Sequence, residues 1–269
     1  MSEIIVNQVY KVFGRNEKQA LEMVKQGIAK SEVLAKTGCT VGLNNVSLSI
    51  NAGEIFVIMG LSGSGKSTLV RHFNRLIEPS AGEILYRGKD VLKLNNNELI
   101  NFRRRNISMV FQSFGLLPHR TVIDNVMYGL KLRGEPKAEA HVCGMKWIEA
   151  VGLKGYEDKH PDQLSGGMRQ RVGLARALAA DTDIMLMDEA FSALDPLIRT
   201  DMQSLLLELQ AKLNKTIVFI THDIDEALRI GAKIAILRDG SLVQVGTPKD
   251  ILEHPADDYV RRFVEKKVH

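Results

Sequence analysis

The chain has 269 residues, a formal net charge of +4 at pH 7, 25% charged residues and 45% hydrophobic residues. This composition excludes an acidic disordered tail. It also gives little support for nucleic-acid binding, which usually shows a concentrated basic stripe, so we expect no nucleic-acid partner. The chain is long enough to bury a large core, either as one α/β unit or as a core with a subdomain.

The two cysteines and the apolar runs indicate the cellular setting. Cys39 and Cys143 lie far apart and match no metal-ligand spacing, so a reducing cytosol fits better than a disulfide scaffold. No apolar run reaches the roughly 18 residues that a membrane-spanning helix needs, and the N-terminus lacks the pattern of a secretory signal. We expect a soluble, cytosolic chain that reaches a membrane only through partner subunits.

The first third of the chain predicts two strands separated by helices. Apolar residues from 4 to 13 predict an opening strand that ends at Gly14, and helical spacing predicts a helical insertion over about 16–37. Within that insertion, Ser31 is the expected N-cap of a second short helix and Gly38 its C-terminal stop. Alternation predicts a half-buried strand over 46–50, and the apolar run 55–59 predicts a strand covered on both faces.

Later segments continue the alternation of strands and helices. Helical spacing dominates 113–180, a buried strand is predicted over 184–187, and a helical stripe covers 202–213. Another buried strand is predicted over 216–220, and a hairpin is predicted around Asp239 and Gly240. This order predicts an open, mainly parallel sheet with a helical subdomain inserted into it.

A phosphate-binding loop is the sharpest local signal. Residues 60–68 match G-x-x-x-x-G-K-[ST], between a predicted buried strand and a predicted helix. Glycines let successive backbone amides point at phosphate oxygens, and the following helix adds the positive end of its dipole. Lys66 supplies a charge for the β and γ phosphates, and the Ser67 hydroxyl is a ligand for Mg²⁺. The residues expected to bind the nucleotide phosphates here are Gly60, Ser62, Gly63, Ser64, Gly65, Lys66, Ser67 and Thr68.

Polar side chains follow the other predicted strands. Asp188 ends the strand over 184–187 and is expected to hold Mg²⁺ through water, while Glu189 is placed to polarise the attacking water. His222 follows the strand over 216–220 and is within reach of a γ phosphate. Gln112 follows a short apolar strand. Its amide can bond both the water shell of the metal and a neighbouring domain, which suits a sensor of whether the γ phosphate is present.

A second anion-binding helix start lies about a hundred residues after Lys66. Ser165, Gly166 and Gly167 open a helix rich in arginine. One nucleotide does not need two such sites, whereas two copies arranged head to tail do. We therefore expect a homodimer in which each Ser-Gly-Gly helix faces the γ phosphate on the other copy's loop.

The ordered set of motifs resembles the ATP-binding subunit of an ABC transporter. Residues 60–68 resemble Walker A, Gln112 the Q-loop, 164–170 the signature, 184–189 Walker B, 192–195 the D-loop and His222 the switch histidine. The resemblance implies a P-loop NTPase (RecA-like) α/β core, an N-terminal antiparallel β portion and an inserted helical subdomain. It also implies one ABC ATPase domain over 1–269, with the signature subdomain at about 113–180. Phe13 matches the adenine-stacking residue of the family, and Asp195 matches a D-loop residue that joins the ATP site.

A finer resemblance is to importers of glycine betaine, proline and related quaternary amines. It rests on the insertion with residues 36–38 and 41–42 and on segments 58–63, 110–121 and 187–196. Many members of that subfamily carry two CBS domains after the ATPase core. This chain stops at His269 without them, so it is either shortened or a natural short form.

The resemblance implies an ATPase that needs ATP and Mg²⁺ and drives a membrane permease, with an extracytoplasmic solute-binding protein as an indirect partner. It would lie peripherally on the cytoplasmic face of the membrane. Glu189, His222 and Lys66 are the expected catalytic residues, and a groove beside Gln112 and Phe114 is expected to grip the permease.

Three alternatives stay open. In the first, the cargo is another small solute such as an amino acid, choline or carnitine. In the second, the chain is a soluble ABC ATPase that acts on DNA or ribosomes. In the third, it is an ordinary nucleotide kinase. A kinase does not need the signature at 164–170, and the spacing after Lys66 leaves no room for the long coiled coils of DNA-repair members.

Overall fold

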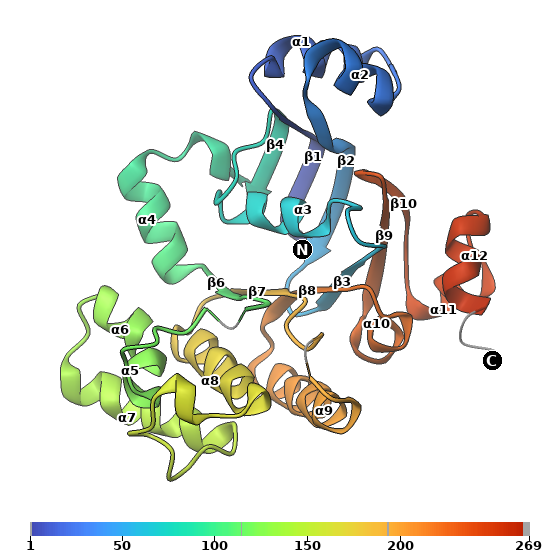
Figure 1. Cartoon of the computed structure of the whole chain (residues 1–269). Helices are drawn as coiled ribbons and strands as arrows, with labels where there is room; N and C mark the ends of the chain where they lie inside the picture. The colour runs from blue at the N-terminus through green and yellow to red at the C-terminus, as the bar shows by residue number, and fades with distance from the viewer. Residues whose placement is uncertain (1, 114, 193, 266–269) are drawn as a thin grey trace. The chain divides into compact units, whose positions relative to one another are not determined.

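The computed structural model describes residues 2–113, 115–192 and 194–265 and divides into two compact units. Unit 1 combines residues 1–95 with 220–269, and unit 2 is 96–219. Figure 1 gives the course of the chain and the labels used below. No helix in the described ranges has both the length and the apolar character needed to span a bilayer.

Unit 1 holds an antiparallel sheet with the order β2-β1-β4-β5, as predicted for the N-terminal portion. Its strands are β1 (Ser2–Phe13), β2 (Thr40–Asn51), β4 (Ala81–Tyr86) and β5 (Lys89–Asp90). Buried residues alternate along much of β2, because one face of the sheet covers the core. The strand β2 is therefore longer than the strand that the apolar pattern predicted over 46–50.

The other strands of unit 1 form a sheet with the strand that leads into the phosphate loop. β3 (Ile55–Met59) is buried at every residue and pairs in parallel with β9 (Lys233–Arg238). β10 (Ser241–Gly246) returns antiparallel to β9 through the predicted turn at Asp239 and Gly240. The unbroken apolar run of β3 agrees with a strand covered on both faces.

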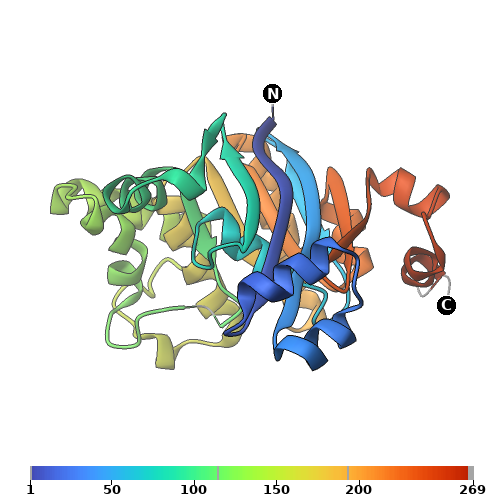
Figure 2. The ribbon, with the colours of Figure 1, turned by 90° about the horizontal axis from the view of Figure 1, so that it is seen from above.

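The predicted helical segment between the first two strands contains α1 (Glu17–Lys25) and α2 (Lys30–Thr37). These helices lie at the end of β1 and β2 opposite the N-terminus (Figure 2). Gly38 ends α2 in a left-handed conformation with φ 70°, as predicted. The expected cap at Ser31 is wrong, because α2 begins at Lys30 and its N-cap residue is Ala29, two positions before Ser31.

The remaining helices of unit 1 flank its strands. α3 follows the phosphate loop, a short 3₁₀ turn follows β5, and α10 follows β8. α11 and α12 come after β10. Their bounds are α3 Lys66–Phe73, the turn Val91–Lys93, α10 Ile224–Ile230, α11 Pro248–Glu253 and α12 Asp258–Glu265.

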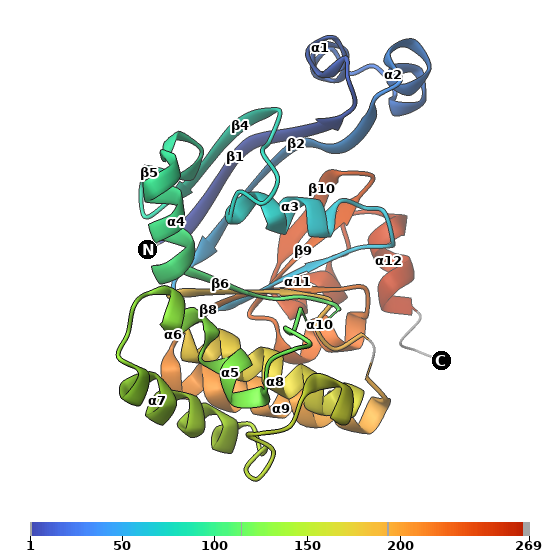
Figure 3. The same cartoon turned by 60° about the vertical axis from the view of Figure 1, so that its left-hand side comes forward.

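Unit 2 combines parallel strands with a group of helices. β6 (Ile107–Val110) pairs in parallel with β7 (Ile184–Asp188), and β8 (Thr216–Thr221) runs from unit 2 into unit 1. The helices α5 to α8 gather together (Figure 3). The helical bounds are α4 Asn96–Arg105, α5 Val122–Val126, α6 Tyr128–Leu132, α7 Lys137–Ala150, a 3₁₀ turn Pro161–Gln163, α8 Gly166–Ala179 and α9 Pro196–Leu213.

Candidate nucleotide-binding site

The phosphate-binding loop connects β3 to α3 in unit 1. β3 ends at Met59, and α3 begins at Lys66 after Gly65, which has φ 99°. A Cβ atom on Gly65 would lie 2.8 Å from the carbonyl oxygen of Gly42, and one on Gly60 would lie 2.3 Å from the carbonyl oxygen of Leu237. Both positions therefore require glycine, because no side chain fits between the loop and the neighbouring backbone.

Lys66 lies inside this loop. The residue is only 4% exposed, and its Nζ donates hydrogen bonds to the carbonyl oxygens of Gly60 (3.0 Å) and Leu61 (3.1 Å). The Ser64 hydroxyl is buried in the same loop and has no hydrogen-bond partner. An orphaned buried hydroxyl beside an enclosed ammonium group and the N-terminus of α3 suits a phosphate chain. Ser67 and Thr68 lie half-buried in the first turn of α3.

Tyr259 of α12 also contacts this loop, and sequence reasoning missed it. Its hydroxyl accepts a hydrogen bond from the Leu61 amide (3.3 Å) and donates one to the carbonyl oxygen of Leu237 (3.2 Å). Burial is the main cause that raises the pKa of this phenol, so it stays protonated. No local signal marks the contact, since Leu61 and Tyr259 are almost 200 positions apart in the chain.

Phe13 ends β1 and presents a partly open ring. It is 41% exposed and pairs with Thr40 of β2, so the insertion leaves the sheet and returns to it at the same place. The Nζ of Lys11 lies 5.2 Å from the ring centroid. The ring also contacts Gly42, whose carbonyl oxygen lies against Gly65 of the phosphate loop. Phe13 is thus close to the loop in unit 1, despite the insertion that follows it.

His222 lies just after β8 in the same unit and is exposed. The next residue, Asp223, is the N-cap of α10, and its Oδ1 accepts hydrogen bonds from the amides of Asp225 (2.9 Å) and Glu226 (3.3 Å). The Asp223 amide donates to Thr221 Oγ1 at 3.0 Å. Asp223 was not predicted, although an aspartate one residue before an apolar helical stretch is a recognisable cap signal.

The acidic pair ends β7 in unit 2. Asp188 is 2% exposed, whereas Glu189 is half-buried and has φ 47°, in the left-handed region that non-glycine residues seldom adopt. The amide and hydroxyl of Ser192 both donate to the carbonyl oxygen of Glu189, at 3.2 and 2.9 Å, and close a tight turn. Gln112 Nε2 donates to Glu189 Oε2 at 3.0 Å. The structure therefore brings Gln112 and Glu189 together.

The Ser-Gly-Gly segment opens α8 in unit 2. Ser165 is the N-cap, and its hydroxyl accepts a hydrogen bond from the amide of Met168 at 3.3 Å. Gly166 has open space where a Cβ atom would lie, while a Cβ atom on Gly167 would lie 2.9 Å from Cγ2 of Ile198. A helix start with a serine cap and small residues in its first turn is a type of site that suits an anion.

Asp195 lies beside this segment. It is the N-cap of α9, and its Oδ1 accepts a hydrogen bond from the amide of Ile198 at 3.1 Å. Ile198 in turn contacts Gly167, so the starts of α8 and α9 are neighbours within unit 2. Two predicted elements, Phe114 of the permease groove and position 193 of the D-loop, lie outside the described residues.

The predicted site residues divide between the two units. Phe13, the phosphate loop and His222 belong to unit 1, and Gln112, Asp188, Glu189, the Ser-Gly-Gly segment and Asp195 belong to unit 2. Among the described residues, no cluster of three His, Cys, Asp or Glu side chains is arranged to hold a metal ion. Ser67 in unit 1 and Gln112 and Asp188 in unit 2 each carry an oxygen donor of the kind that Mg²⁺ prefers in proteins.

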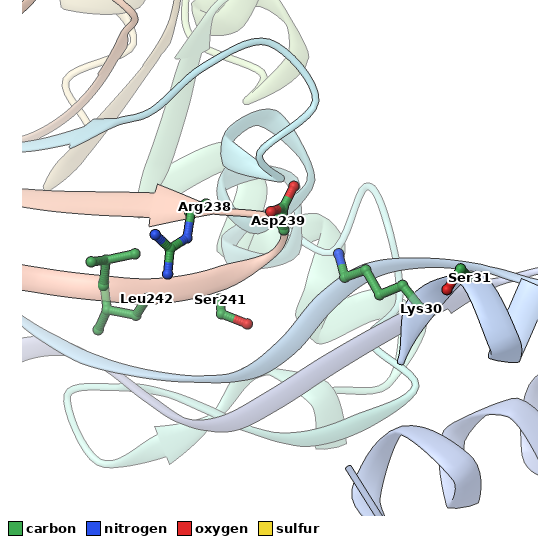
Figure 4. Close-up of a pocket in the computed structure, with 7 residues that line it drawn as sticks. Lys30, Ser31, Arg238, Asp239, Ser241 and Leu242 are labelled. Atoms are coloured by element: carbon green, nitrogen blue, oxygen red, sulfur yellow. The ribbon is translucent and has the colours of Figure 1, made fainter. Parts of the chain in front are cut away.

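A separate cavity of about 780 Å³ lies in unit 1 between α2 and the β9–β10 turn. In Figure 4, the Lys30 side chain extends from α2 toward Asp239. Its Nζ donates to the carbonyl oxygen of Val41 at 3.1 Å. Burial lowers the pKa of Lys30, and the Asp239 carboxylate partly opposes that shift. The cavity shows that the insertion reaches the same turn that packs against the phosphate loop.

Comparisons with known proteins agree with this geometry. The family model described as ABC transporter matches residues 43–192. The chain is 58% identical to the glycine betaine/carnitine transport ATP-binding protein GbuA of Listeria monocytogenes, covering 98% of this chain and 67% of GbuA. It is 56% identical to the glycine betaine transport ATP-binding protein OpuAA of Bacillus subtilis, covering 98% of this chain and 63% of OpuAA. The chain thus spans about two thirds of the length of these relatives.

A solved structure extends the likeness to the fold. The dimeric, post-hydrolysis ATP-binding cassette MJ0796, bound to ADP and Pi, superposes with a TM-score of 0.77 at 31% identity, covering 91% of this chain and 98% of that one. This confirms the predicted P-loop NTPase class, with its mainly parallel core, antiparallel N-terminal sheet and inserted helices. The chain belongs to the ABC transporter family, as one of its ATP-binding cassettes.

Proposed function

We propose that this chain hydrolyses ATP to drive an ABC importer of glycine betaine, proline betaine or a related quaternary amine. The observation that carries the ATPase part is the phosphate loop, with Lys66 enclosed by backbone carbonyls and the Ser64 hydroxyl buried beside it. The solute class is supported by identity. The sequence identity is 58% and 56% to two relatives named for glycine betaine, but 49% to a relative named for trimethylamine N-oxide and 44% to one named for choline.

Binding of ATP would use the residues of unit 1 first. The amides of 62–68 and the Lys66 ammonium would hold the β and γ phosphates, with Phe13 stacked on adenine. Ser67, Gln112 and, through water, Asp188 would hold Mg²⁺, which supplies charge neutralisation at the phosphates. The two units would act together as one ATPase domain.

Hydrolysis would depend on Glu189. Its carboxylate would accept a proton from water as the water oxygen forms a bond to the γ phosphorus and the bond from that phosphorus to the β–γ bridging oxygen breaks. His222 would donate a hydrogen bond to the γ phosphate as charge develops. The contact of Gln112 with Glu189 supports a role for Gln112 in reporting the state of the site to a permease.

The second half of each site would come from another copy of the chain. Ser165 caps α8, Gly166 and Gly167 form its first turn, and Asp195 caps the neighbouring helix α9. In a head-to-tail homodimer, this surface would contact the γ phosphate held by the other copy. ATP would then favour the closed dimer and ADP would not, because only the γ phosphate contacts both copies. Closure would move the permease at the cytoplasmic face of the membrane.

The variant Glu189→Gln tests this proposal. We expect it to bind ATP with normal affinity, to lose hydrolysis and to accumulate as a dimer with Mg-ATP, measured by light scattering after gel filtration. Glu208→Gln is the matched control, because Glu208 lies exposed on α9 and pairs with the exposed Lys212 in an i,i+4 bridge. Normal hydrolysis by Glu189→Gln would show that Glu189 is not the base.

The solute class needs a transport measurement. Uptake of glycine betaine, choline and trimethylamine N-oxide should be compared in cells that express the chain together with a permease and a solute-binding protein of a glycine betaine importer. We expect glycine betaine to be taken up best. Stimulation of the ATPase by DNA, without effect of a permease, would instead support a soluble ABC ATPase.

A further inference from the structure

Gly42 occupies an irregular position in β2. In the pairing of β1 with β2, Lys11 lies opposite Leu43 and Val12 lies opposite Val41, so Gly42 is an extra residue between two paired positions. Such a β-bulge bends the strand and changes the direction of nearby side chains, and bulges are common beside functional sites. This bulge lies next to Phe13.

The ring of Phe13 fills the space where a side chain at position 42 would start. A Cβ atom on Gly42 would lie 2.6 Å from Cε2 and 3.3 Å from Cδ2 of Phe13. Gly42 is not in the left-handed region of φ, so its backbone conformation is open to other residues. The requirement for glycine is therefore steric and comes from the ring.

The same residue also contacts the phosphate loop. The carbonyl oxygen of Gly42 would lie 2.8 Å from a Cβ atom on Gly65 and 2.5 Å from one on Gly240. Gly240 is itself joined to the loop, because its amide donates to the carbonyl oxygen of Ser64 at 2.9 Å. Gly42 thus touches the aromatic ring on one side and the loop segment on the other.

The insertion fixes the strands on both sides of the bulge. Val12 and Val41, which pair with each other, are buried in one cluster with Ala20, Met23, Val24, Val33 and Cys39. Lys11, whose ammonium lies over the Phe13 ring, also pairs with Glu17 of α1 at 3.5 Å, and Glu17 accepts a hydrogen bond from Ser80. The strands on both sides of the bulge are therefore held in place, so a side chain at position 42 would displace the partly exposed Phe13 ring.

We propose that Gly42 is a positioning residue that sets the Phe13 ring at the distance from the phosphate loop that a nucleoside triphosphate requires. The proposal rests on the proposed function, in which the loop binds the phosphates and Phe13 stacks on the base. Gly42 itself touches no nucleotide and acts through Phe13.

The test compares ATP with inorganic tripolyphosphate, which has the phosphates but no base, by calorimetry on the full chain. In Gly42→Ala, we expect ATP affinity to fall about five-fold or more, as expected for loss of a base–aromatic stack, while tripolyphosphate affinity stays unchanged. Phe13→Ala should show the same selective loss. The double variant should bind ATP no more weakly than Phe13→Ala alone, because the two residues act through one contact.

Controls separate the proposed role of Gly42 from the proposed binding of ATP on which it rests. Gly129→Ala makes the same chemical change in α6, where the added Cβ would make an ordinary contact 3.5 Å from Ala180, and should leave both affinities unchanged. If Gly42→Ala fails to fold, the double variant should fold, because removing the ring removes the clash. Normal ATP binding by Gly42→Ala, or losses that add in the double variant, would overturn the proposal. If Phe13→Ala also binds ATP with normal affinity, Phe13 is not the residue that stacks on the base. If the unmodified chain does not bind tripolyphosphate, the phosphate loop is not an ATP site.

Discussion

His72 makes the stability of the phosphate-loop helix sensitive to acid. It lies on α3, is fully buried, and its Nδ1 is 2.7 Å from the carbonyl oxygen of Ile77. Since a carbonyl only accepts, Nδ1 carries the proton, and Nε2 is buried without a partner. Burial is the main cause that lowers the pKa of His72 to about 4, and Lys11 lowers it further while the bond to Ile77 and Glu78 raise it.

The magnitude follows from linkage between protonation and folding. An unfolded histidine titrates near 6.5, so His72 in the folded chain stays neutral while the unfolded chain takes up a proton. The free energy of unfolding is unaffected above pH 6.5, falls by about 1.4 kcal/mol per pH unit below it, and has lost about 3 kcal/mol once the pH reaches the folded pKa.

Urea denaturation at pH 7.5, 6 and 5 would measure this loss. His72→Asn keeps an N–H donor near the Nδ1 position and does not titrate, so the unmodified chain should lose about 2 kcal/mol more than the variant between pH 7.5 and 5. His141→Asn is the matched control, because His141 is exposed on α7. Parallel stability curves for the unmodified chain and His72→Asn would refute the reasoning.

Three further predictions concern contacts around the site. Tyr259→Phe removes the hydroxyl that connects the Leu61 amide to β9, so we expect the free energy of unfolding to fall by about 1 kcal/mol and ATP to bind more weakly by calorimetry. Unchanged ATP binding would show that α12 does not support the loop. Asp223→Ala removes the cap of α10 and should cost about 1 kcal/mol in thermal unfolding, whereas Asp223→Asn should cost less; equal losses would exclude the cap as the cause. Val33→Ala truncates a fully buried side chain in the core of the insertion and should lower the free energy of unfolding by about 1–2 kcal/mol, measured by urea denaturation. A negligible loss would show that this cluster packs loosely.

Local motifs made much of the site predictable. The phosphate loop depends on glycines and a lysine within nine successive residues, and Gly38 stops α2 as expected. Ser165 caps α8 because its hydroxyl bonds an amide three residues away, which is again a short-range effect. In each case, the signal lies in residues that are close together in the sequence.

Other features depend on packing between distant segments. The contact of Gln112 with Glu189 joins residues 77 positions apart, and Glu189 has a left-handed backbone conformation that its residue type does not predict. The bulge at Gly42 depends on the register of β1 against β2, which the apolar pattern does not determine. Ser31 was a misleading signal, because a favourable cap residue inside a short helix does not decide where that helix begins.

A mixing experiment tests the central claim that two copies share each ATP site. Lys66→Ala removes the phosphate-binding ammonium, and Ser165→Arg blocks the helix start that would face the other copy's nucleotide. Each variant alone should lack ATPase activity. In a mixture, a dimer of one chain of each kind retains one site with an intact Lys66 from one copy and an intact Ser165 from the other, so we predict that activity returns. A mixture that forms mixed dimers with ATP yet stays inactive, or a Ser165→Arg chain with normal activity alone, would contradict the shared site.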